Sequence, residues 1–140
     1  MAITLKNPAS DFASALTTQS VGGVTLTSGA NLFFRYLHPT PLDLSVYLLN
    51  NGGEAPEAYL STTDQAVFHA QVQALIYGAP GEDGFDQAET LARGVLGFMQ
   101  QNVLSGYISV FALSSQPLHI IEPDTQRHIF SIDFEARYGA

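Results

Sequence analysis

Residues 67–77 read VFHAQVQALIY, and this stretch decides the fold class because its side chains alternate between apolar and polar. A period of two is typical of a strand that buries one face. The even-numbered positions from Phe68 to Ile76 would form the apolar face, whereas His69, Gln71 and Gln73 would lie on the opposite face. The chain is therefore expected to contain a sheet, and the neighbouring segments indicate what packs on it.

A loop and a helix are predicted after this strand. Residues 78–84 read GAPGEDG, and such a mixture of glycine, proline and acidic residues is typical of a loop. Residues 85–101 carry apolar side chains at helical spacing, which predicts an amphipathic helix. Gly94 and Gly97 weaken the helix propensity of this segment, and we expect them to allow close packing on the sheet.

Three further strands and one short helix complete the predicted fold. Strand-like alternation recurs in residues 42–49, 107–116 and 128–137. Asn7 and Pro8 match a helix N-cap followed by a first-turn proline, so a short helix is expected over residues 8–18. Together these elements predict an α+β fold. It would have a four-stranded, largely antiparallel sheet, one main amphipathic helix packed on a face and a short N-terminal helix.

The length and composition of the chain limit the classes of protein to which it can belong. Its 140 residues fit one domain across residues 1–140, because two domains would each fall near the lower size limit for a stable core. The absence of cysteine excludes disulfide frameworks, thiolate metal sites and cysteine nucleophiles. No stretch approaches the roughly 18 uninterrupted apolar residues of a membrane span, and no signal-peptide pattern is present. The expected location is the cytoplasm or a particle assembled there.

The charge of the chain is strongly acidic, with 13 Asp and Glu residues against five Lys and Arg, a formal charge of -8. Between Arg35 and Arg93 there is no Lys or Arg, and the acidic residues of that stretch are Asp43, Glu54, Glu57, Asp64, Glu82, Asp83, Asp86 and Glu89. Such a surface disfavours nucleic-acid recognition through phosphate contacts and binding to anionic membranes. Three roles of this acidic surface remain open: it keeps the protein soluble, it forms an acidic wall past which DNA moves without binding, or it docks a basic partner.

The residue types that carry chemistry do not form a recognisable catalytic or metal-binding motif. The four histidines lack metal-ligand spacing, so satisfied or solvent-facing side chains are favoured for His38, His69, His119 and His128. No nucleophile elbow, phosphate-binding loop or dinucleotide fingerprint is present. We therefore predict a protein that is not an enzyme and has no metal or cofactor.

A carboxylate site is the alternative chemical hypothesis. Glu82 and Asp83, with Asp86, could act in acid/base chemistry or hold a cation, although a solvated loop leading into a helix N-terminus explains them as well. A small acidic enzyme or ligand-binding domain would use these carboxylates together with His69. A general interaction module is a further alternative.

Five short motifs follow one another in a recognisable order. They read NLFF at 31–34, PTP at 39–41, LSVY at 44–47, GGEAP at 52–56 and FSIDF at 130–134. In this order and spacing they resemble the tail terminator and minor capsid (tail completion) proteins of long-tailed bacteriophages, over about residues 11–138. The chain departs from the family pattern in two places: the polar face of the strand at 67–77 carries His69, Gln71 and Gln73 where the family often has Arg or Lys, and the turn at 122–127 has no glycine.

The resemblance implies a structural virion protein of the tail or neck, assembled in the host cytoplasm. Such proteins form a ring, expected to be a hexamer, that caps the head-proximal end of the tail tube and ends tube polymerisation. The implied partners are further copies of the chain, the tail tube protein and a head-completion or stopper protein, with DNA only in transit through the lumen and no membrane. The alternative within phages is another neck or head–tail connector component. The family supplies no catalytic residues.

Ring assembly requires surfaces that dock to neighbours. The two predicted polar loops, residues 50–63 and 78–84, are our candidates for docking to other subunits or to the tube, because long loops in a small domain are often functional. The candidate protein-interaction residues are acidic and lie in or beside these loops: Glu54, Glu57, Asp64, Glu82, Asp83 and Asp86.

Overall fold

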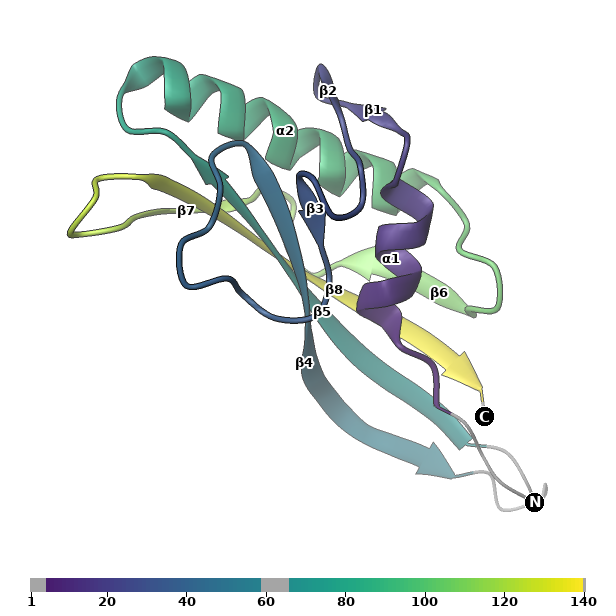
Figure 1. The fold of residues 1–140 in the computed structure, drawn as a ribbon. Helices are drawn as coiled ribbons and strands as arrows, with labels where there is room; N and C mark the ends of the chain where they lie inside the picture. The colour runs from purple at the N-terminus through teal and green to yellow at the C-terminus, as the bar shows by residue number, and fades with distance from the viewer. Residues whose placement is uncertain (1–4, 59–65, 140) are drawn as a thin grey trace.

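The computed structural model describes residues 5–58 and 66–139, and these form two helices, one mixed sheet of six strands and a separate two-stranded ribbon (Figure 1). The strands of the main sheet follow the order β3-β4-β5-β8-β6, and β7 also pairs with β8. Their bounds are β3 (Leu32–Phe33), β4 (Ser45–Ala58), β5 (Ala66–Gly78), β6 (Ser109–Ala112), β7 (Leu118–Ile121) and β8 (His128–Gly139).

The pairing pattern determines which strands form the two edges of the main sheet. β3 lies parallel to β4, and the remaining pairs are antiparallel. β6 pairs with the C-terminal part of β8, whereas β7 pairs with its N-terminal part. β6 and β7 therefore share one edge of the sheet, and β3 occupies the opposite edge.

Both helices pack on the same face of this sheet. Helix α1 (Pro8–Leu16) begins at the Asn7 cap, whose side chain accepts a hydrogen bond from the Ser10 amide, and packs on β4 and β5; helix α2 (Glu82–Gln101) packs on β5, β8 and β6. Phe12 of α1 meets Phe134 of β8 edge to face, with ring centroids 5.5 Å apart. Burial of such apolar side chains between the helices and the sheet is the main source of stability of the fold.

A small ribbon also packs against α2. Strands β1 (Ser20–Val21) and β2 (Val24–Thr25) form this ribbon, which contacts the helix at Gly94. A Cβ added to Gly94 would lie 2.7 Å from Val21 Cγ1 and 2.8 Å from the Gly22 nitrogen, so the close approach requires glycine. Gly94 thus allows the expected close packing, on the two-stranded ribbon and not on the main sheet, whereas a Cβ on Gly97 would meet nothing within 4 Å, so Gly97 is not needed for close packing.

The predicted four-stranded, largely antiparallel sheet is also wrong, since the sheet is mixed and has six strands among the residues described. β3 comes from an apolar cluster without a clear period, and its two residues join the sheet by pairing with β4. β7 follows Pro117, and all four of its residues are exposed, so it shows no alternation of burial. Neither strand shows an alternating sequence pattern of its own. Both form because they pair with strands that are distant in the sequence.

The predicted polar loops are largely parts of regular elements. Most of residues 50–63 belongs to β4, which continues to Ala58 through two irregularities in its pairing with β5; residues 59–63 lie outside the described part of the chain. In the second segment Gly78 ends β5 and Glu82 begins α2, three residues before the predicted helix start, so only residues 79–81 connect them. The strand predicted at 67–77 and the helix start at Pro8 are confirmed.

Replacing Gly53 with alanine is expected to destabilise the fold by about 2–3 kcal/mol. Gly53 lies at an irregularity of β4 with φ 128°, and a Cβ there would overlap the carbonyl oxygen of His69 on β5. The matched control is Gly52→Ala, since Gly52 also has a positive φ, 70°, but a Cβ there would meet nothing within 4 Å. Urea unfolding of both variants measures the difference, and equal losses of stability would show that the approach to His69 is unimportant.

Candidate functional site

The acidic residues proposed as interaction residues separate into two groups. Glu54 and Glu57 lie on β4, whereas Glu82, Asp83 and Asp86 lie in the first turns of α2, and all five are exposed. Asp64 lies outside the described residues. Glu57 pairs with Val67 near the start of β5, and α2 follows the end of that strand, so β5 separates the groups. A strand of this length places them roughly 35 Å apart, at opposite ends of the sheet.

This separation bears directly on the hypothesis of a small acidic enzyme. That hypothesis combines His69 with the carboxylates of Glu82, Asp83 or Asp86. His69 lies four residues into β5, beside Glu54 and Glu57, and the carboxylates of α2 lie beyond the other end of the strand. The structure therefore does not bring the proposed catalytic residues together.

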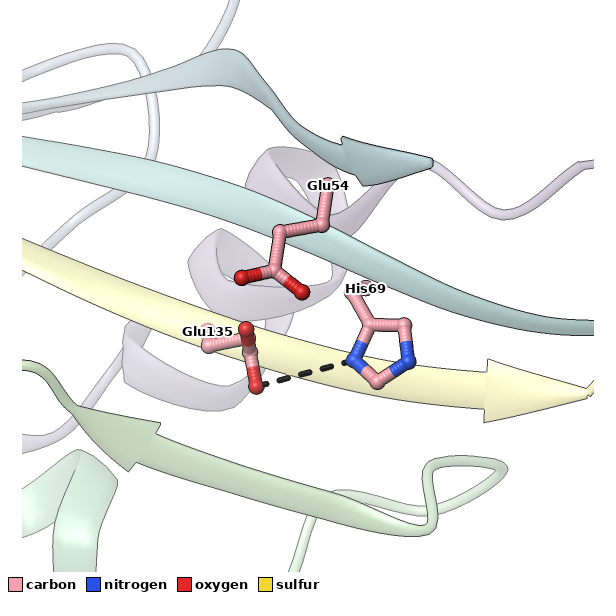
Figure 2. A group of neighbouring side chains, drawn as sticks. All are labelled: Glu54, His69 and Glu135. Atoms are coloured by element: carbon pink, nitrogen blue, oxygen red, sulfur yellow. Dashed lines mark ion pairs between the residues drawn. The ribbon is translucent and has the colours of Figure 1, made fainter. Parts of the chain in front are cut away.

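A different set of side chains does meet around His69, on the sheet face opposite the helices (Figure 2). Glu54 on β4 and Arg137 on β8 pair with His69 from its two sides. His69 Nε2 lies 3.1 Å from Glu57 Oε2, and His69 Nδ1 lies 3.8 Å from Glu135 Oε2. Arg137 Nε donates a hydrogen bond to the same Glu135 oxygen at 2.9 Å. Three strands thus contribute to one cluster of ionisable groups.

Two members of this cluster are buried although neither α1 nor α2 covers this face of the sheet. His69 is 8% exposed and Glu135 is 6% exposed. The Arg137 side chain helps to shield these two residues from solvent, since its guanidinium lies over the Phe111 ring of β6, 5.3 Å from the centroid. Sequence reasoning placed His69 on a polar strand face and did not single out Glu135 or Arg137. The missing information was the register of β5 against β8, which local patterns do not contain.

The edge formed by β6 and β7 exposes large apolar side chains. On β7, Leu118 is 64% exposed, Ile120 is 44% exposed and Ile121 is 47% exposed. Ile108 and Leu113, on either side of β6, are 64% and 47% exposed. An apolar edge strand with unpaired backbone groups is a ready surface for pairing with another chain. We call these five residues the β6/β7 edge.

A hollow of about 210 Å³ lies beside the opposite edge of the sheet. Its lining is mainly apolar and aromatic and includes Leu32 and Phe33 of β3, with Phe34, Tyr36 and His38 of the segment that follows. We call it the β3 hollow. Four strand-to-strand steps separate β3 from β7, which corresponds to about 19 Å. The chain therefore has an apolar strand edge at one edge of the sheet and an apolar hollow beside the opposite edge.

The segment after β3 is held against the uncovered face of the sheet. Phe33 stacks on Tyr47 of β4 at 4.9 Å, and Arg127 donates a hydrogen bond from Nε to Asp43 Oδ1 at 3.0 Å. The Arg127 guanidinium also lies 5.0 Å from the centroid of the Tyr77 ring. Burial, followed by the nearby Glu122 carboxylate, raises the pKa of Tyr77, so this ring stays neutral at ordinary pH. Of these contacts, the Phe33–Tyr47 stack holds the wall of the β3 hollow, and the Arg127 contacts hold the chain just before β4.

Within residues 5–58 and 66–139, no helix is both long enough and apolar enough to cross a bilayer.

Comparisons with known proteins give a likeness of fold. No protein-family model matches the sequence. No curated protein matches it. Among solved structures, the chain is similar to one in the "Virion of native gene transfer agent (GTA) particle", with a TM-score of 0.51 and 17% sequence identity over 80% of this chain and 81% of that chain. The protein therefore shares its fold with a component of a virion particle.

Proposed function

We propose that this chain is a structural virion protein that forms a six-fold ring at the head-proximal end of a phage-like tail tube. The observation that carries the proposal is the fold shared with a chain of a gene transfer agent virion, over most of both chains. The order of the five motifs, from NLFF at 31–34 to FSIDF at 130–134, supports the tail-terminator role within that class. In this role the ring ends tube polymerisation and joins the tail to head-completion proteins.

The two sheet edges supply the contacts that a ring needs. A closed ring of identical subunits uses a heterologous interface, in which one patch of each subunit meets a different patch of the next. The β6/β7 edge and the β3 hollow are two such patches, since both are apolar and they lie at opposite edges of the sheet. We propose that the β6/β7 edge of one copy docks at the β3 hollow of its neighbour.

Contacts through the sheet edges would leave the two ends of the strands for other partners. Glu54 and Glu57 lie at one end, and Glu82, Asp83 and Asp86 lie at the other. In the ring, one acidic group would face the tail tube protein and the other would face the head-completion or stopper protein. The six acidic residues, Asp64 included, thus remain our candidate interaction residues.

The charge of the chain suits a ring through which DNA moves. A chain of formal charge -8 gives a hexamer of about -48, which repels the phosphate backbone. DNA in the lumen would therefore pass without sticking. The proposed role requires no catalysis and no membrane contact, and it places the protein in the virion after assembly in the host cytoplasm.

Native mass spectrometry and negative-stain imaging of the purified chain test the ring. We expect a particle of six chains, or a ring on the ends of added tail tubes. A strict monomer at high concentration that also fails to bind tail tubes would contradict the proposal. The main alternative, another neck or head–tail connector component, predicts binding to head-completion proteins but not to the tube end.

A further inference from the structure

We propose that Glu54, His69 and Glu135 bind one divalent cation of the zinc class. The proposal is independent of the ring and rests on the cluster at the meeting point of β4, β5 and β8. Sequence reasoning favoured a satisfied or solvent-facing His69. The structure instead buries His69 and gives a hydrogen bond to only one of its two ring nitrogens.

The first argument concerns the protons of the imidazole ring. An ionised carboxylate only accepts hydrogen bonds, so the contact of 3.1 Å with Glu57 Oε2 places a proton on His69 Nε2. In the neutral ring Nδ1 then carries a lone pair. Among the buried side-chain nitrogens and oxygens of the described residues, Nδ1 is the one atom without a hydrogen bond. A buried lone pair directed at carboxylates is costly unless a cation lies between them.

The second argument is the arrangement of the possible ligand atoms. One ligand atom from each of Glu54, His69 and Glu135 lies within 4.8 Å of the other two, and Figure 2 shows the three side chains pointing toward one another. Atoms bound at about 2.1 Å to a shared ion lie about 3.0–4.2 Å apart, so small side-chain rotations would complete the site. The separation of 3.8 Å between His69 Nδ1 and Glu135 Oε2 already falls in this range.

The surrounding groups have the roles that outer partners take around bound metals. A metal-binding histidine commonly donates its other N–H to a carboxylate, and Glu57 is positioned to accept it from His69. Arg137 donates a hydrogen bond from Nε to Glu135 Oε2, the oxygen that lies 3.8 Å from His69 Nδ1, and can hold this carboxylate in place beside the ion. Three carboxylates and one guanidinium leave a formal charge of -2 around a neutral imidazole, which a divalent cation neutralises.

The donor set indicates the class of metal. One imidazole nitrogen with two carboxylates suits Zn²⁺ and similar first-row ions, whereas Mg²⁺ and Ca²⁺ prefer sites made of oxygen atoms alone. The ligands come from three adjacent strands, so the bound ion would link these strands. Because an ion that binds only the folded state stabilises it, zinc is expected to raise the melting temperature.

Calorimetric titration of the full chain with Zn²⁺, after treatment with a chelator, tests the site. We expect one ion per wild-type chain, and Glu54→Gln is expected to weaken binding by at least about tenfold. Glu54 is exposed and its side chain has no role in the core, so this variant should fold, as circular dichroism will show. Mg²⁺ and Ca²⁺ at the same concentration are expected to leave the melting temperature unchanged.

Two control variants separate this site from other places where zinc could bind. Glu89→Gln makes the same chemical change on α2, and His119→Gln removes a histidine that lies 2.9 Å from His128. Both are expected to keep the wild-type affinity for the ion at His69. Absence of stoichiometric zinc binding, or equal binding by wild type and Glu54→Gln, would overturn the proposal and indicate that a proton occupies Nδ1. If only His119→Gln lost zinc binding, the ion would lie at His119 and His128, and the proposal of a site at His69 would be overturned as well.

Discussion

Replacing Leu118 and Ile120 with lysine is expected to abolish the ring while the monomer stays folded. Both side chains are exposed on β7, 64% and 44%, so the change removes no core contact. Anchor residues at the centre of an interface each contribute about 2 kcal/mol or more, so the double variant should weaken subunit association by at least about 100-fold. Sedimentation measures the assembly, and thermal unfolding confirms the fold. Ser14→Lys, which adds one lysine at an exposed position of α1 away from the β6/β7 edge, is the control for the effect of an added positive charge.

A mixing experiment tests whether the two patches bind each other. Tyr36→Lys changes the β3 hollow at a residue that is 64% exposed, and it is expected to block the ring by itself. Each of the two variants keeps one intact patch. Mixed together, they should form dimers of one copy of each and nothing larger, because only one contact can be made. If the mixture stays monomeric, or if the double lysine variant still forms rings, the proposed interface is wrong.

Replacing Phe134 with alanine is expected to reduce the free energy of unfolding by about 3–5 kcal/mol, a large share of the roughly 5–15 kcal/mol available to a small domain. Phe134 is 0% exposed and meets Phe12 edge to face, so its removal leaves a cavity between α1 and β8. The control is Phe111→Ala on β6, where the ring is half-buried on the opposite face and contacts Arg137.

Phe111→Ala is expected to reduce the free energy of unfolding by about 1 kcal/mol, since this variant loses one cation–π contact and the partial burial of the ring. Chemical unfolding with a common m-value compares the two variants. Equal losses of stability would mean that α1 does not pack on the sheet through Phe134.

The elements that could be predicted from the sequence are those with a strong pattern of their own. β5 shows alternation over most of its length, α2 has a continuous apolar stripe, and Asn7 with Pro8 marks the start of α1. In each case one local pattern was enough, because the apolar face of the element is the face that packs on the core.

The elements that could not be predicted depend on pairing with distant residues. β3 is only two residues long and lies parallel to β4, and β7 is exposed along its length, so neither shows a period. The turn-like residues from Asn50 to Pro56 predicted a loop, whereas irregular pairing allows β4 to continue through them. The sheet consequently has more strands and a different topology than predicted.

The cluster around His69 shows the same limit. Its members come from β4, β5 and β8, and alternation correctly placed His69 and Glu135 away from the apolar face. Alternation could not show that the register sets Arg137 opposite His69, or that both His69 and Glu135 are buried there. The sequence therefore led us to propose Glu54 and Glu57 as acidic interaction residues, without the histidine that lies beside them.

The proposed role of this chain, as a building block at the head-proximal end of a phage-like tail, can be tested on whole particles. The most direct measurement is to label the chain with a specific antibody and image particles purified from the host that produces it. We expect label at the head-proximal end of each tail and nowhere else on the particle. Purified particles that lack the chain, or that carry it along the tube or over the head, would show that this role is wrong.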